Sequence, residues 1–138
     1  MKKLVTLALS LLCVLPLFAQ SQDGQKITKK NLVIKEWNTS PKGTNGTLDH
    51  ETTYNADGRK IEEKEYDADG KMKWRKRYEY DAAGRVSKEL VYSGKNNLKT
   101  YKTFDYNEFG RKKVQYTYDA KGKLLSYKKF EYIVQAAE

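Results

Sequence analysis

Apolar and polar residues alternate along most of the chain, which is the pattern of β-strands with one face more buried than the other. Between residues 72 and 80, for example, Met72, Trp74, Tyr78 and Tyr80 alternate with charged side chains. No segment has a convincing helical period. The alternation and the turn-forming residues between the runs predict strands over 31–37, 48–54, 60–66, 71–80, 85–92, 98–106, 111–118 and 123–132.

One short motif, Y-[DN]-x-x-G-[RK], punctuates these strands. It begins at Tyr54, Tyr66, Tyr80, Tyr106 and Tyr118, and a degenerate copy, YSGKNN, begins at Tyr92. The intervals between successive tyrosines alternate between a shorter and a longer one, so the true period is a pair of strands, as from Tyr54 to Tyr80. A fixed period of this size is typical of a repeat architecture. Because the connections are short, neighbouring strands should pair. We predict an all-β antiparallel meander of repeated β-hairpins, a single twisted or curled sheet of seven or eight strands.

The motif fits a type I turn followed by a residue in the left-handed region, a common hairpin connection. Glycine is favoured at that last position because a Cβ is penalised there. The predicted turn glycines are Gly58, Gly70, Gly84, Gly110 and Gly122. The Asp or Asn that follows each tyrosine can accept a hydrogen bond from the turn backbone.

The turn also predicts a register for the paired strands. If Asp81 lies opposite Arg85, strict alternation places Tyr80 opposite Val86, Tyr78 opposite Lys88, Lys76 opposite Leu90 and Trp74 opposite Tyr92. On the other face it places Arg77 opposite Glu89, Lys73 opposite Glu65, Arg75 opposite Glu63, and Asp105 opposite both Arg85 and Lys113. Opposite charges across antiparallel strands contribute roughly 0.2 to 1 kcal/mol per pair, so the charges favour this register.

One face of the predicted sheet is rich in aromatic side chains. A single layer that exposes so much aromatic surface would be unusual for a monomer, so we expect something to cover it. The favoured candidates are the sheet itself, curled into a barrel or roll, and the strand over 32–37. A second copy of the protein or a ligand are the alternatives.

The segment from Met1 to Ala19 is typical of a secretory signal peptide, because Lys2 and Lys3 precede an apolar run that ends at Ala19. That run is short for a membrane span of ~20 residues. We therefore expect export to the periplasm, the outer surface or the medium, with no transmembrane span in the mature chain. A retained anchor and a lipoprotein acceptor at Cys13 are minor alternatives. We expect a flexible mature N-terminus over 20–30, a repeat domain over 31–132 with repeats from about 48, and a tail over 133–138.

Composition limits the chemistry of the mature chain. Cys13 is the only cysteine and His50 the only histidine, so we expect no disulfide, no thiol catalysis, no metal site and no cofactor. Without Lys2 and Lys3, 25 basic residues remain against 18 acidic ones, a formal charge of +7. Such a charge can attract anionic polymers. We favour the simpler interpretation that lysines guard exposed strands, and we do not expect nucleic acid as a partner.

Paired carboxylates are the one catalytic possibility in the sequence. Glu62, Glu63 and Glu65 could supply them for glycoside chemistry. Their predicted cationic partners lie on a solvated face, where carboxylates keep ordinary pKa values and make poor general acids. We therefore predict a protein that is not an enzyme, and a small glycan-active enzyme is the least favoured alternative.

Aromatic residues interleaved with lysines form the predicted binding surface. Rings can stack on sugars or bases, and nearby ammonium groups can hold anionic groups. The candidate binding residues are Trp74, Lys76, Tyr78, Lys88, Tyr92 and Lys102. The sequence favours a protein that binds an envelope or extracellular polymer such as an acidic or neutral polysaccharide. The alternative is a structural protein that self-associates as a homo-oligomer through its aromatic face.

The repeated motif is often preceded by an aromatic residue, as in Tyr78-Glu79-Tyr80 and Phe104-Asp105-Tyr106. In this form it resembles the YD repeat of Rhs-type bacterial surface proteins over residues 54–132. The chain is also similar to small secreted Bacteroidetes proteins of uncharacterised function. The resemblance implies a β-hairpin repeat fold and export, and it brings no catalytic residues. Because the array is far too short to enclose a cargo, we do not expect it to form a shell around a toxin.

Overall fold

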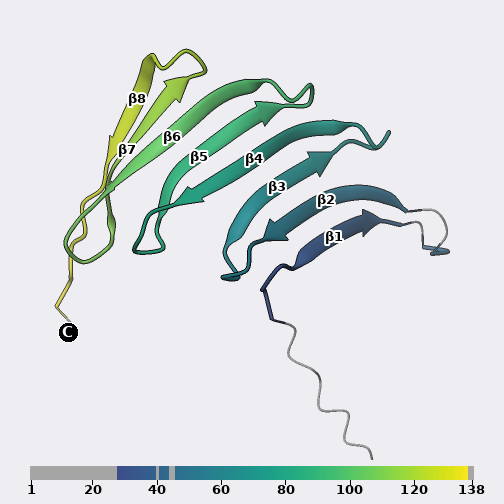
Figure 1. The fold of residues 1–138 in the computed structure, drawn as a ribbon, viewed down its shortest axis with the longest axis horizontal. Helices are drawn as coiled ribbons and strands as arrows, with labels where there is room; N and C mark the ends of the chain where they lie inside the picture. Colours follow the sequence, from purple (N-terminus) through teal and green to yellow (C-terminus); the bar gives the residue numbers. More distant parts are fainter. Residues whose placement is uncertain (1–27, 40, 44–45, 137–138) are drawn as a thin grey trace, which may run out of the picture.

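The protein forms one open sheet of eight antiparallel strands, and the described residues contain no helix (Figure 1). The computed structural model describes residues 28–39, 41–43 and 46–136. The strands are β1 (Val33–Asn38), β2 (Thr47–Tyr54), β3 (Lys60–Tyr66), β4 (Met72–Tyr80), β5 (Val86–Ser93), β6 (Leu98–Tyr106), β7 (Lys112–Asp119) and β8 (Leu124–Lys129). Their order in the sheet is their order in the chain. The predicted all-β meander is therefore confirmed.

The strand limits follow the repeat closely. β3 and β6 have the predicted bounds, and β1, β2, β4, β5 and β7 differ by one or two positions at an end. The prediction of a last strand that continues to Tyr132 is wrong, because β8 ends at Lys129. The predicted signal peptide lies outside the described residues, as does the predicted flexible segment up to residue 27.

The hairpin turns repeat one hydrogen-bonding pattern. In the Tyr80 turn, the N–H of Asp81 donates to the carbonyl of Arg85 and the N–H of Gly84 donates to the carbonyl of Asp81. The side chain of Asp81 accepts a further bond from the N–H of Arg85. The five turn glycines have φ between 72° and 86°. In the degenerate copy Asn96 takes their place with φ 63°, so the YSGKNN turn keeps the same geometry.

The predicted register holds for one pair beside the turn and then fails. Tyr80 lies opposite Val86, but the next pair is Glu79 with Lys88, which leaves Ser87 as an extra residue. Every strand pair has one such β-bulge next to its connection. An extra residue shifts all later pairs by one.

The corrected pairs differ from the expected ones on both faces. Tyr78 lies opposite Glu89, Lys76 opposite Val91, Trp74 opposite Ser93 and Arg77 opposite Leu90. Glu65 lies opposite Trp74, Glu63 opposite Lys76 and Asp105 opposite Val114. Arg85 lies outside the strands. The expected charge pairs of Arg77 with Glu89, Arg75 with Glu63, and Asp105 with Arg85 and Lys113 are therefore wrong. Lys73 is not opposite Glu65, although the two form an ion pair.

The shifted register divides the side chains between two faces. We call the side that carries Trp74, Glu63 and Lys102 the tryptophan face. Directly opposed residues lie on the same side of a sheet, as does every second residue along a strand, and these two rules place the three residues on one side. We call the opposite side, which carries Tyr101, Tyr116, Tyr118 and Tyr127, the tyrosine face.

No second layer covers either face within the part of the chain that the structure describes. The sheet does not close, because β1 and β8 lie at its two edges (Figure 1). The only buried residue described is Thr52, with 7% of its surface exposed, and no hydrophobic side chain is buried. The expected barrel or roll is therefore wrong, and so is a cover made by the first strand, because β1 extends the edge of the sheet.

Tyrosine side chains bind neighbouring strands together at one end of the sheet. The hydroxyls of Tyr80, Tyr106 and Tyr132 donate to the carbonyls of Lys60, Val86 and Lys112 at 2.6, 2.6 and 2.8 Å. The guanidinium groups of Arg59, Arg85 and Arg111 lie over the same three rings. The tyrosine hydrogen bond and the arginine contact each recur once per repeat. Since the described residues form no buried core, these contacts and the strand ladders hold each hairpin only to its neighbours, as in other repeat proteins.

Candidate functional site

The six candidate binding residues do not form one patch. Trp74, Lys76, Tyr78 and Lys102 lie on the tryptophan face, whereas Lys88 and Tyr92 lie on the tyrosine face. The prediction from sequence placed them together because it assumed that side chains alternate strictly between the two faces from the turn onward. The bulges place part of β5 on the opposite side from that expected.

Carboxylates pair with three lysines of the tryptophan face. Lys60 contacts Glu63 at 2.6 Å, and Tyr78 donates its hydroxyl proton to the same carboxylate. Lys102 lies 3.3 Å and Lys76 4.0 Å from Glu89. These lysines are thus already paired, which weakens this face as a site for an anionic polymer.

The ionisation of this network opposes acid catalysis. Partial burial acts to raise the pKa of Glu63, but hydrogen bonds from Lys60 and Tyr78 outweigh it and hold the pKa below its usual range. Burial, with the hydrogen bond to Glu63, raises the pKa of the Tyr78 hydroxyl well above its usual range. At neutral pH, Glu63 is ionised and Tyr78 keeps its proton. The carboxylate is therefore unable to act as a general acid.

The β1 to β4 half of the tyrosine face is a ladder of alternating charges. Glu51 contacts Lys64 at 2.9 Å and Lys35 at 3.6 Å, and Lys64 contacts Glu62 at 3.0 Å. The hydrogen bond from Lys64 is the main reason why the pKa of Glu51 is lowered. Glu62 in turn lies 3.5 Å from Arg75. The ladder leaves little uncompensated charge on this half.

Arg75 joins the charged half to an aromatic half. Its guanidinium carbon lies 4.3 Å from the centre of the Tyr92 ring. Its Nε atom is buried and has no hydrogen-bond partner among the described residues. Stacking on an aromatic ring compensates part of that loss.

Four tyrosines from three adjacent strands form the aromatic half, and we call them the tyrosine platform: Tyr101 on β6, Tyr116 and Tyr118 on β7, and Tyr127 on β8. The rings of Tyr101 and Tyr118 are stacked, with centres 4.9 Å apart and planes inclined by 15°. The centre of the Tyr116 ring lies 6.5 Å from that of Tyr118 and 6.4 Å from that of Tyr127. The platform is open to solvent at Tyr127, which is 57% exposed.

A lysine ammonium group lies close to each of two rings of the platform. The ammonium of Lys88 lies 5.4 Å from the centre of the Tyr101 ring, and that of Lys129 lies 6.0 Å from the centre of the Tyr127 ring. Sequence reasoning missed all four tyrosines of the platform as site residues. The separation of Tyr101 and Tyr127, which equals that of Tyr80 and Tyr106 and hence one repeat, was a signal that could have found two of them.

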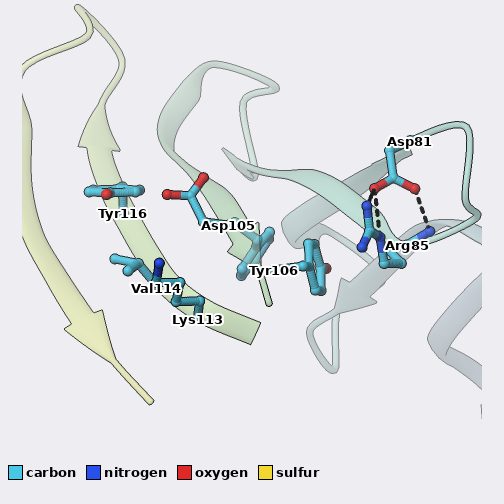
Figure 2. A pocket seen from close by; sticks show the side chains of 8 residues that line it. Asp81, Arg85, Asp105, Tyr106, Lys113, Val114 and Tyr116 are labelled. Atoms are coloured by element: carbon cyan, nitrogen blue, oxygen red, sulfur yellow. Dashed lines mark hydrogen bonds and ion pairs between the residues drawn. The ribbon is translucent and has the colours of Figure 1, made fainter. Parts of the chain in front are cut away.

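A polar hollow adjoins the platform at Tyr116 (Figure 2). It is an open depression lined by Asp81, Arg85, Phe104, Asp105, Tyr106, Lys113, Val114 and Tyr116. Arg85 and Asp81 form an ion pair of 2.8 Å. Desolvation and the nearby negative charge of Asp105 raise the pKa of the Tyr116 hydroxyl. The hollow therefore offers hydrogen-bond donors and acceptors beside half-buried rings.

Two structural features that would suggest other functions are not found in the described ranges. No group of three or more His, Cys, Asp or Glu residues there is arranged to hold a metal ion. No helix there is long and apolar enough to cross a membrane.

Comparison with known proteins gives little information on function. No protein family model matches the chain, and no curated protein matches it. Among solved structures, it is similar to a protein of unknown function from Bacteroides fragilis. The two share 14% sequence identity, and the match covers 72% of this chain and 93% of that one with a TM-score of 0.26. A similarity this low supports no inference about function.

Proposed function

We propose that the protein is an exported, non-enzymatic β-hairpin repeat protein that binds an envelope or extracellular polysaccharide. The observation that carries this proposal is the tyrosine platform, in which four rings lie together on one face that no described residue covers. The ring centres of neighbouring members lie 4.9 to 6.5 Å apart, so the four rings form one aromatic cluster that is open to solvent at Tyr127.

A platform of this kind suits a neutral or weakly charged polymer. Aromatic rings stack on flat ligands largely through their faces, and each stacked unit contributes roughly 1 to 3 kcal/mol in the well-studied case of single-stranded nucleic acid. Tyrosine adds a hydroxyl that can bond to a ligand or to water. The hollow beside Tyr116 supplies charged groups that can bind sugar hydroxyls.

Export is supported by the sequence alone. The segment from Met1 to Ala19 has the pattern of a secretory signal, and the repeat resembles the YD repeat of bacterial surface proteins. The absence of catalytic function is supported by the paired carboxylates, of which Glu63 and Glu51 both have lowered pKa values.

Binding should be tested on mature residues 20–138 with a panel of neutral and acidic polysaccharides at two salt concentrations. Tyr101→Leu and Tyr118→Leu each remove a ring and retain an apolar side chain. We expect each to weaken binding about tenfold, since about 1.4 kcal/mol corresponds to that factor.

Phe109→Leu is the matched control, because Phe109 is an aromatic residue in the β6–β7 turn and is 77% exposed. It should leave affinity unchanged. Equal loss in all three variants, or binding that disappears at the higher salt concentration, would contradict the proposal and favour simple charge attraction. Self-association that Tyr101→Leu abolishes would instead support the structural alternative, in which a second copy covers the tyrosine face.

A further inference from the structure

Exposed large apolar side chains gather at the two ends of the sheet. Apart from Phe109, those described are Val33, Ile34 and Trp37 on β1, and Leu124, Leu125, Tyr127, Phe130, Tyr132, Ile133 and Val134 on β8 and the segment after it. The strands from β2 to β7 contain none. Repeat proteins usually end in units with a polar outer face, and here the described ends are apolar.

Both end strands also have a backbone edge that no described residue pairs. The N–H of Phe130 donates to Lys113 on β7, so by alternation the backbone groups of Tyr127 and Lys129 point away from the sheet. The carbonyl of Leu32 accepts from Tyr54 on β2, so those of Val33 and Lys35 point outward at the other edge. An unpaired edge of this kind is a template for another strand.

The geometry of the sheet allows its two edges to pair with each other in different molecules. All seven strand pairs are antiparallel, so β1 and β8 run in opposite directions (Figure 1). A second copy placed beside the first therefore sets its β1 antiparallel to β8. The outward residues Lys35 and Tyr127 both lie on the tyrosine face, so the two copies have the same face on the same side.

We propose that β8 of one copy pairs with β1 of the next, which extends the meander through a row of molecules. The outward backbone groups favour a register with Tyr127 opposite Lys35 and Lys129 opposite Val33. Ser126 then lies opposite Glu36 and Lys128 opposite Ile34, without a like-charge contact. A shift by two positions that moves Tyr127 opposite Trp37 would oppose Lys129 to Lys35, which is unfavourable.

This interface is head-to-tail, so only the two copies at the ends of the row keep a free edge, and the row stays open. It goes beyond the proposed binding function and does not depend on it, because no ligand takes part. The geometry favours a second copy of the protein as the partner of β8. The β1 strand of that copy runs antiparallel to β8 and has its tyrosine face on the same side, as in each strand pair within the sheet.

Two single-cysteine variants test the proposal, since Cys13 precedes the mature chain. Lys35→Cys and Tyr127→Cys are prepared separately as residues 20–138, mixed and oxidised. Directly opposed residues in antiparallel strands have Cα atoms about 4.5 to 5.5 Å apart, within disulfide range. We expect a cross-linked dimer from the mixture and not from either variant alone. Glu36→Cys mixed with Tyr127→Cys is the matched control and should cross-link poorly, because these side chains lie on opposite faces.

Unmodified protein should also increase in mean mass with concentration in light scattering, without ligand. A constant monomer mass together with no mixed cross-link would overturn the proposal, and would leave the edges to a different partner. A dimer formed by Tyr127→Cys alone would also overturn it, because it would indicate a symmetric β8 to β8 contact. Thermal unfolding of both variants shows that they fold.

Discussion

The hydroxyl of Tyr106 donates a hydrogen bond of 2.6 Å to the carbonyl oxygen of Val86, twenty residues earlier in the chain. Tyr80 makes the same bond to Lys60 one repeat earlier, and Tyr132 makes it to Lys112 one repeat later. The period of the sequence is thus also a period of tertiary contacts. Each of these bonds links two neighbouring strands at the end of the pair away from its bulge, beyond the last ladder pair such as Lys88 with Thr103.

Removal of this bond should lower stability measurably. Tyr106→Phe keeps the ring under Arg85 and leaves the Val86 carbonyl without its donor. We expect a loss of about 1 kcal/mol in the free energy of unfolding, the usual net value of one hydrogen bond. Urea denaturation measures it. Tyr127→Phe is the control, and an equal loss there would contradict a specific role for the Tyr106 hydroxyl.

The turn glycines differ in what surrounds them. The free-energy cost of a left-handed backbone can therefore be separated from that of steric crowding by an added Cβ. At Gly110, with φ 72°, an added Cβ would meet no atom within 4 Å. Gly110→Ala should therefore cost only the left-handed conformation, roughly 1 to 2 kcal/mol. At Gly84, with φ 79°, the Cβ would also crowd the guanidinium of Arg59.

We expect Gly84→Ala to destabilise the protein somewhat more than Gly110→Ala, by thermal unfolding. Arg59→Ala in the Gly84→Ala background should remove the difference. If both glycine variants unfold at the wild-type temperature, the left-handed turn is not a constraint on the fold.

The bulges can be tested by charge coupling. Glu51 and Lys64 are directly opposed and 2.9 Å apart. A double-mutant cycle with Glu51→Gln and Lys64→Met should give a coupling of about 0.5 kcal/mol. Arg77 and Glu89 lie on opposite faces, so the cycle with Arg77→Met and Glu89→Gln should be additive. Strong coupling of the second pair would restore the register without bulges.

Stability should fall in alkaline solution. Burial, together with the hydrogen bond to Glu63, raises the pKa of Tyr78 in the folded state above the ordinary tyrosine value of 10.0. Burial also raises the pKa values of Tyr80 and Tyr106. A raised folded pKa gives stability that is fully present below pH 10 and is lost as the pH rises through the folded value.

Denaturation midpoints from pH 8 to pH 11 measure this effect. Tyr78→Phe has no ionisable hydroxyl, so its midpoint should fall less steeply than that of the wild type above pH 10. The same slope in both proteins would show that Tyr78 does not contribute to the alkaline loss.

The hairpin repeat could be predicted from sequence because its signals are local. Gly84 and Asp81 define their turn within one short motif, and the same signals recur in each copy. The register could not be predicted beyond the first pair. The extra residues at the bulges include Ile61, Lys73, Ser87 and Lys99, and these share no side-chain property that would mark a bulge.

The candidate site was misplaced for the same reason. One extra residue per strand pair placed Tyr92 and Lys88 on the side opposite Trp74. It was also not predictable that the described residues leave both faces uncovered, since the aromatic content suggested a core. In the structure the tyrosine rings contact arginines, carbonyls and one another along a single layer.

The regular recurrence of the tyrosine hydrogen bonds, once in every repeat, has an evolutionary consequence. Duplication or loss of one whole repeat would add or remove two strands, while each remaining tyrosine kept its carbonyl twenty residues earlier. An even change in strand number also preserves the direction and facing of the end strands. The number of repeats can therefore change without a new fold.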